Sequence, residues 1–100
     1  MKKALVIGIE DYVQNPLYGC KNDADEITKL LEWNYDETKN FDISKLTEKV
    51  TAEQVRKVLS KLFQDQAEVL FYFSGHGVVI GDEPHLLLSD KGDPMQTIPF

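Results

Sequence analysis

Two short apolar runs, Ala4 to Ile9 and Val69 to Phe73, contain no charged residue. Both are rich in β-branched or aromatic side chains, which is the pattern of a strand buried on both faces. Antiparallel strands commonly keep one polar face, so these runs predict a parallel sheet.

Apolar positions at helical spacing predict a first helix after the loop from Glu10 to Lys21. Its apolar stripe consists of Ala24, Ile27, Leu30 and Leu31. The side-chain oxygen of Asn22 or Asp23 can cap this helix. The carboxylates of Asp25 and Glu26 would then lie in its positively charged first turn.

A second helix has the clearest helical spacing in the chain. Thr51, followed three residues later by Gln54, forms a capping box at its start. The apolar positions of this helix are Val55, Val58, Leu59, Leu62 and Phe63. Before it, Ile43 to Val50 alternates weakly between apolar and charged positions, which predicts a short strand near the edge of the sheet.

The last third of the chain is predicted to contain a β-hairpin. Val78 to Ile80 and His85 to Leu88 are apolar segments that flank a Gly81-Asp82 turn. Asp90 to Pro99 is rich in turn-forming residues, and we predict turns there.

The order strand, helix, strand, helix, strand predicts an α/β sandwich built through right-handed crossovers. The two most apolar strands should be central neighbours, with the charged strand outside them. The loops Glu10 to Asp23 and Ser74 to Gly77 would then converge in a crevice at the topological switch point. We therefore expect the functional site there.

This arrangement leaves an apolar strand at the margin of the sheet. Val69 to Phe73 would form an open hydrophobic edge, which invites aggregation. The hairpin region could cover that edge, but further strands would explain it better. The sequence therefore predicts one portion of a larger domain.

Composition limits the class of protein. The chain has 100 residues, of which 42% are hydrophobic and 28% charged, as in a soluble single domain. It carries 17 Asp plus Glu against 11 Lys plus Arg. The absence of a basic patch argues against nucleic-acid and anionic-membrane partners. No segment approaches the roughly 20 apolar residues of a membrane span, so we expect a cytoplasmic location.

The segment Gly75-His76-Gly77 is the strongest local candidate for chemistry. Histidine transfers protons near neutral pH, and flanking glycines leave backbone N–H groups available to an oxyanion. A tight turn with a solvent-facing histidine is the structural alternative. Cys20 is the only thiol. It could be a nucleophile paired with His76 or a small buried apolar side chain, and the second reading is favoured.

Other polar groups give weaker signals. Asp23 would be fully explained as a helix cap. Glu10 and Asp11 suggest a cation site of the receiver type, but such a site needs a third acid where this chain has Ser74. The spacing of the two histidines and Asp90 fits no zinc or iron pattern.

Two motifs make the sequence resemble a known family. Tyr72-Phe73-Ser74-Gly75-His76-Gly77 follows the second apolar run, and Leu17-Tyr18-Gly19-Cys20-Lys21-Asn22-Asp23-Ala24 follows the first. Together with Ala4 to Ile9 they closely resemble the caspase-like cysteine peptidases (peptidase C14), and most of all metacaspases and their prokaryotic relatives. The similarity runs from residue 3 to about residue 90.

The resemblance implies roles for particular residues. His76 matches the catalytic histidine, and Gly77 matches the residue whose N–H helps to form the oxyanion hole. Asp23, with Cys20 and Ser74 beside it, matches the pocket that receives the substrate residue before the cleaved bond. A carboxylate there would pair with Arg or Lys. The caspases proper use arginines, one of them in the loop after the first strand, where this chain has none.

The resemblance also implies an incomplete catalytic set. The nucleophilic cysteine of the family lies roughly 50 residues beyond the histidine, past Phe100. We therefore expect residues 1–100 to be the N-terminal portion of a single caspase-like domain and to be inactive alone. The remaining C-terminal part, or a partner chain carrying it, would complete the peptidase. The substrate would be a protein or peptide, and no cofactor is expected, although many metacaspases bind calcium.

A different function class remains open. The chain could be a non-catalytic caspase-like module that serves protein interaction or regulation. A strand ending in an Asp-x-Cys-like motif after Phe100 would favour the peptidase, and its absence would favour the module.

Overall fold

The computed structural model describes residues 2–12, 16–64, 68–89 and 96–99. In chain order the elements are β1 (Lys2–Gly8), α1 (Cys20–Glu32), β2 (Asp42–Leu46), α2 (Ala52–Gln64), β3 (Glu68–Ser74), β4 (Gly77–Ile80), β5 (Glu83–Ser89) and β6 (Gln96–Pro99).

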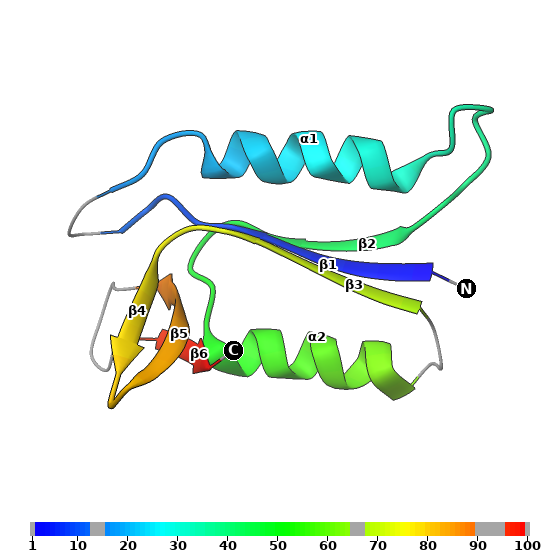
Figure 1. Cartoon of the computed structure of the whole chain (residues 1–100). Helices are drawn as coiled ribbons and strands as arrows, with labels where there is room; N and C mark the ends of the chain where they lie inside the picture. Colours follow the sequence, from blue (N-terminus) through cyan, green and yellow to red (C-terminus); the bar gives the residue numbers. More distant parts are fainter. Residues whose placement is uncertain (1, 13–15, 65–67, 90–95, 100) are drawn as a thin grey trace.

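The first three strands form a parallel sheet with the order β2-β1-β3. This order confirms that the two most apolar strands are neighbours and that the charged strand lies outside them. Helix α1 covers one face of the sheet and α2 covers the other (Figure 1). Because β2 and β3 flank β1 on opposite sides, the switch point lies between the carboxyl ends of β1 and β3.

Alternate residues of β1 build two hydrophobic cores. Leu5, Ile7 and Ile9 are fully buried on the α2 side, where they join Val55 and Leu62. Ala4 and Val6 face the other way, where they meet Ala24 of α1. The predicted two-sided burial of this strand is confirmed, and the side chains toward α1 are the smaller ones.

Gly8 brings α1 close to the end of β1. A Cβ atom at Gly8 would lie 2.4 Å from the backbone oxygen of Cys20 and 2.8 Å from the Cβ of Ala24. Both distances are shorter than real Cβ contacts, so no side chain fits here. The first turn of α1 is therefore held against the strand end.

The start of α1 differs from the prediction. Gly19 occupies the N-cap position in the left-handed region (φ 94°), and no side chain caps the helix. Asn22 and Asp23 are thus inside the helix rather than capping it. Asp23 is the acidic residue of the first turn, and the predicted place of Asp25 and Glu26 there is wrong. Glycine adopts this φ without steric cost. The helix therefore begins at Cys20, before the predicted caps Asn22 and Asp23.

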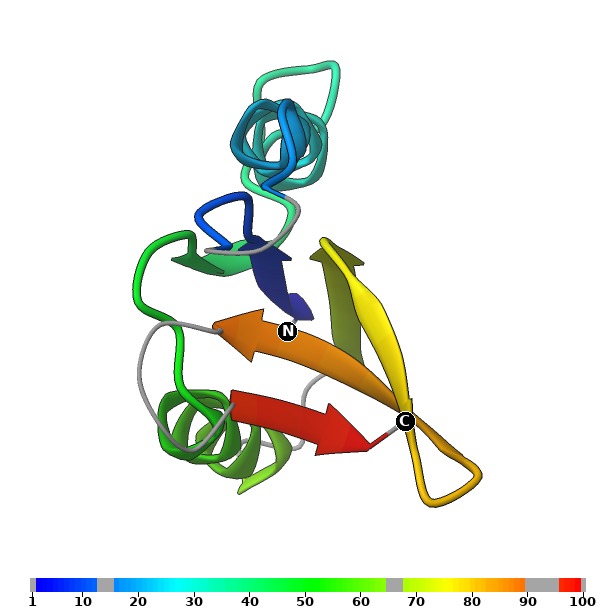
Figure 2. The same ribbon diagram turned by 90° about the vertical axis from the view of Figure 1, so that its left-hand side faces the viewer.

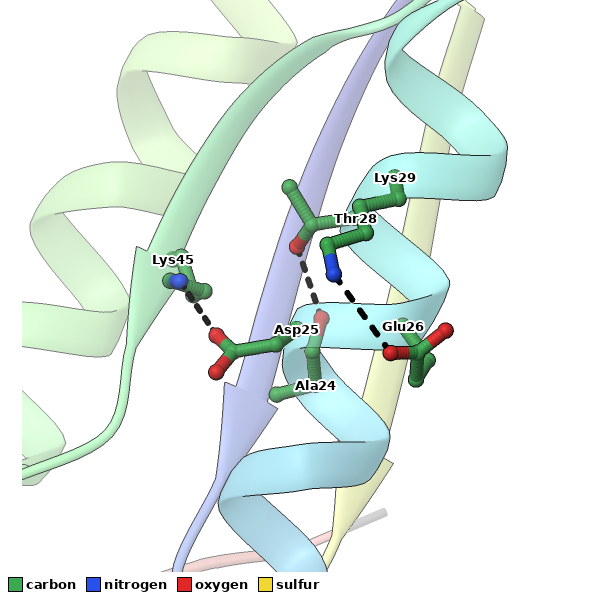
Figure 3. A network of polar contacts seen from close by, with 6 residues as sticks. All are labelled: Ala24, Asp25, Glu26, Thr28, Lys29 and Lys45. Carbon is green, nitrogen blue, oxygen red and sulfur yellow. Dashed lines mark hydrogen bonds and ion pairs between the residues drawn. The ribbon is translucent and has the colours of Figure 1, made fainter.

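Asp25 and Glu26 instead take part in surface ion pairs. Asp25 pairs with Lys45 of β2, and Glu26 lies 3.5 Å from Lys29 of the same helix (Figure 3). The hydrogen bond from Lys45 holds the pKa of Asp25 below its usual range. Thr28 Oγ1 donates to the carbonyl of Ala24 at 2.8 Å, one turn earlier. The Asp25–Lys45 pair ties α1 to β2, whereas the other two contacts lie within the helix.

Two residues of the predicted helical stripes point outward. Leu30 is 72% exposed and Phe63 is 67% exposed, so the prediction is wrong for both. At about 100° per residue, Phe63 lies roughly 80° around α2 from Val55, whereas Leu62 lies only about 20° away. The capping box is confirmed: Thr51 N–H donates to Gln54 Oε1, and Gln54 N–H donates to Thr51 Oγ1.

The strand predicted over Ile43 to Val50 is shorter than expected. It ends at Leu46, and Val50 is buried outside it, just before α2. Val50 is apolar because it packs in the core on the α2 side. The prediction treated that packing position as part of the strand.

The predicted hairpin is confirmed as β4 paired antiparallel with β5. Its turn has positive φ at both Gly81 (55°) and Asp82 (68°), as two-residue type I′ hairpins require. The sequence missed β6, which pairs with β5 inside the predicted turn region. A four-residue segment that ends in proline is too short to show the alternation of apolar and polar residues typical of a strand. It becomes a strand only by pairing with β5. Residues 90–95 of that region lie outside the described residues.

The three later strands form a separate sheet on the α2 side of the molecule (Figure 2). Ala52 N–H, at the start of α2, donates to Gln96 Oε1 of β6 at 3.0 Å. The second sheet therefore does not continue the first. In the part of the chain that the structure describes, no strand pairs with the outer edge of β3.

Candidate functional site

The carboxyl ends of β1 and β3 lie side by side and carry the two candidate loops. Gly8 pairs with Ser74 in the parallel register, and Ile9 N–H donates to the Ser74 carbonyl at 2.9 Å. The chain leaves both strands at the same end of the sheet (Figure 1). Segments more than 60 residues apart in sequence therefore meet at the predicted switch point.

Asp23 and Ser74 meet across this junction. Ser74 Oγ donates to Asp23 Oδ2 at 3.4 Å, which links the end of β3 to the first turn of α1. Since Gly19 provides the helix start, the Asp23 carboxylate does not serve as a cap. It is exposed to solvent. A cationic side chain could therefore reach this carboxylate.

Cys20 is in a different position. It is the first residue of α1, and only 7% of it is exposed. Its backbone oxygen lies over Gly8, so the residue is part of the contact between helix and sheet. A buried thiol in this setting behaves as a small apolar side chain. This is the structural alternative stated for Cys20.

His76 lies two residues after the end of β3, and hydrogen bonds to its backbone groups hold it in place. Its N–H donates to the Tyr12 hydroxyl at 2.9 Å, and its carbonyl accepts from Leu87 N–H at 2.9 Å. The Tyr12 and His76 rings have centroids 4.5 Å apart at an interplanar angle of 48°. His76 is half-buried, so this turn is not simply a solvent-facing loop.

Gly77 begins β4 and is exposed. In an antiparallel pair, residues opposite each other alternate between hydrogen-bonded and non-hydrogen-bonded positions. Leu87 N–H bonds to His76, so the next pair, Gly77 with Leu86, is non-hydrogen-bonded. The N–H of Gly77 therefore points away from β5, and among the described strands β4 is an outer strand of its sheet.

The sequence analysis missed Tyr12. This residue is 3% exposed and contacts the His76 turn, although it comes from the loop after β1. The sequence offered only a weak signal, since Tyr12 is one of two tyrosines in the loop after β1 and the other, Tyr18, is exposed. The hydrogen-bond partners of Tyr12 lie 64 and 75 residues away and leave no local pattern.

The acidic loop after β1 contacts the start of α1. Glu10 Oε2 accepts a hydrogen bond from Lys21 N–H at 3.4 Å, so the carboxylate contacts the first turn of α1. The side chain of Lys21 lies 2.9 Å from Glu48 Oε1. The hydrogen bond that Lys21 Nζ donates to the Glu48 carboxylate raises the pKa of Lys21. These contacts fix the loop and the start of α1 relative to each other.

No group of three or more His, Cys, Asp or Glu side chains that could hold a metal ion occurs among the residues described. Within those same ranges, no helix has the length and apolar character needed to cross a membrane.

Comparison with known proteins gives one family. The family model described as the caspase domain, peptidase C14, matches residues 1–98. No curated protein and no solved structure gives a significant match. The parallel three-stranded sheet with a helix on each face is compatible with part of a caspase-like fold. On this evidence, the chain belongs to the caspase-domain family of peptidases.

Proposed function

We propose that this chain is the histidine-bearing part of a cysteine endopeptidase of the metacaspase type, which cleaves after Arg or Lys and acts in the cytoplasm. The observation that carries the proposal is the meeting of two groups at the ends of β1 and β3. The Ser74–Asp23 pair lies there, and His76 follows two residues after Ser74.

The proposed reaction is acyl transfer. A cysteine thiolate attacks the scissile carbonyl carbon, and a thioester forms as the peptide C–N bond breaks. His76 supplies the proton that the leaving amine takes up. The outward N–H of Gly77 donates to the oxygen that becomes negatively charged. Water then hydrolyses the thioester and restores the thiol.

The thiol must come from outside these residues. Cys20 is buried against Gly8 and belongs with Asp23 and Ser74, near the position that the substrate side chain would take. We therefore propose that a C-terminal part of the domain, or a partner chain, provides the nucleophile. The 100 residues alone should not turn over peptides, and Cys20-dependent turnover by them would contradict the proposal.

The carboxylate of Asp23 supports the choice of substrate. It is exposed, and one neighbouring hydroxyl donates to it at the long distance of 3.4 Å. A guanidinium or ammonium group could form a shorter, charge-assisted bond. Arg56, the only arginine, lies on α2, which covers the opposite face of the sheet from α1. No arginine of this chain is therefore placed beside Asp23 to favour an acidic substrate residue.

The test uses the protein purified at natural length from the cells that make it, with fluorogenic peptides ending in Arg, Lys or Asp. We expect cleavage after Arg and Lys, reduced about 10²- to 10⁴-fold by His76→Ala. His85→Ala is the matched control, because it removes the other histidine, which lies on β5 beside Thr97. Cleavage that survives His76→Ala would refute the assignment.

The same assay tests the specificity. Asp23→Asn should lower kcat/KM for Arg and Lys peptides roughly 10- to 100-fold, since a charge-assisted bond is lost. Asp25→Asn, on the same helix but paired with Lys45, should leave kcat/KM nearly unchanged. A preference for Asp peptides would refute the proposed specificity. A natural-length protein that cleaves none of them would instead support the non-catalytic interaction module.

A further inference from the structure

The hydroxyl group of Tyr12 lies between two strands of the hairpin that follows His76. It accepts a hydrogen bond from His76 N–H (2.9 Å) and donates one to the carbonyl of Leu87 (2.7 Å). Leu87 N–H in turn donates to the His76 carbonyl at 2.9 Å. These three bonds form a closed ring that uses both backbone groups of both residues.

The register of the hairpin shows what this hydroxyl replaces. Gly77 faces Leu86 in the β4–β5 pair, so the next opposed residues are His76 and Leu87. A regular hydrogen-bonded pair exchanges two direct N–H···O=C bonds. Here one of them is present, and the other is relayed through the Tyr12 hydroxyl. The Tyr12 hydroxyl oxygen therefore separates the two backbone segments of the hairpin at His76.

The aromatic ring of Tyr12 adds a second contact to the same residue. Only 3% of Tyr12 is exposed, and the centroid of its ring lies 4.5 Å from the centroid of the His76 ring. The ring is anchored in the core on the α2 side, together with Ile9 and Leu87. Backbone and side chain of His76 thus both rest on one rigid, core-anchored residue.

We infer that Tyr12 is a positioning residue for His76, which sets the orientation of the imidazole by inserting its hydroxyl into the β4–β5 ladder. The catalytic meaning of this inference rests on the proposed function, whereas the positioning itself does not. Without the hydroxyl, the ladder either closes directly or loses one bond. Both outcomes move His76 relative to the end of β3.

The first test uses NMR on the 100-residue chain, at a concentration at which light scattering shows it to be monomeric. Tyr12→Phe removes only the hydroxyl, and we expect it to shift the His76 and Leu87 amide resonances and the His76 imidazole resonances. The His85 imidazole, the only other one, serves as the internal reference. Tyr72→Phe, the same chemical change on the α1 side of β3, is the control. If His76 moves no more in Tyr12→Phe than in this control, the inference is wrong.

The second test needs no variant. In the wild-type chain, the Tyr12 hydroxyl proton should exchange slowly enough to be observed and should show a nuclear Overhauser effect to the His76 amide. A hydroxyl proton that exchanges freely with water would overturn the inference, even if the variant did not fold.

A kinetic test separates this inference from the proposed function. In the natural-length protein, Tyr12→Phe should lower kcat about tenfold or more and leave KM within about twofold, because a misplaced imidazole affects the chemical step. A tenfold rise in KM with kcat unchanged would contradict a positioning role. If the protein cleaves nothing, the proposed function fails while the NMR result still decides the position of Tyr12.

Discussion

The Tyr12 hydroxyl occupies the space that a side chain at Gly75, the residue before His76, would need. A Cβ atom at Gly75 would lie 2.5 Å from the hydroxyl oxygen and 2.8 Å from Cζ of Phe73. The hydroxyl cannot move aside without giving up its bonds to His76 and Leu87. Glycine is needed at position 75 because a side chain has no space there, whereas the sequence analysis explained the glycine by a backbone N–H left available to an oxyanion.

This crowding gives a prediction about coupled substitutions. Gly75→Ala should lower the free energy of unfolding by about 1–3 kcal/mol, the usual cost of overpacking. In the Tyr12→Phe background the same change should cost about 1 kcal/mol less, because the nearest atom is gone. Urea unfolding of the four proteins measures the difference. Strictly additive costs would show that Gly75 and Tyr12 do not contact each other.

For individual residues, the sequence predicted which ones lie at the same end of the sheet, but it did not predict the contacts that hold them in place. Asp23, Ser74 and His76 could be assigned to one end of the sheet, since they follow predicted neighbouring strands. Cys20 could be demoted because a lone cysteine is most often buried. Tyr12 could not be found, because its partners are backbone groups brought near only by the completed hairpin.

At the scale of elements, the contact between β1 and α1 depends on small residues. The side of β1 toward α1 carries Ala4, Val6 and Gly8, and the opposing helix contributes Ala24. Small side chains let the helix lie close to the strand. Asp23 is thereby brought within reach of Ser74, so the site geometry depends on this packing.

Gly8→Ala should therefore be strongly destabilising. The new methyl group would lie 2.4 Å from a backbone oxygen, which cannot rotate away. We expect a loss of about 2–3 kcal/mol in the free energy of unfolding, at the upper end for overpacking. Gly77→Ala is the control, since its Cβ would lie 3.6 Å from the nearest atom. Equal losses in the two variants, measured by urea unfolding, would contradict the close packing of α1.

The elements differ in how well the sequence predicted them. The parallel strands and α2 have patterns contained in a few adjacent residues, and both were found. The start of α1 depends on the backbone conformation of Gly19, which no spacing reveals. Strand β6 exists only through its pairing with β5, so its four residues looked like a turn.

For the whole molecule, the outer edge of β3 determines how the chain behaves in solution. The strand pairs with β1 along all seven residues on one side. On the other side, no strand pairs with it in the ranges described. Its residue Phe71 is 39% exposed. An uncapped apolar edge of this kind can pair with the same edge of another molecule.

We therefore predict that the 100-residue chain self-associates as its concentration rises, and that Phe71→Lys suppresses this. A charge on an edge strand is the usual protection against edge-to-edge pairing. Phe63→Lys is the matched control, because it makes the same change of charge on an even more exposed aromatic residue, located on α2. Light scattering across a concentration series measures the mass of each protein. If Phe63→Lys is as effective as Phe71→Lys, general surface hydrophobicity rather than the β3 edge drives association. If wild type remains monomeric throughout, the β3 edge does not pair with other molecules and gives no physical reason to expect further strands beside it.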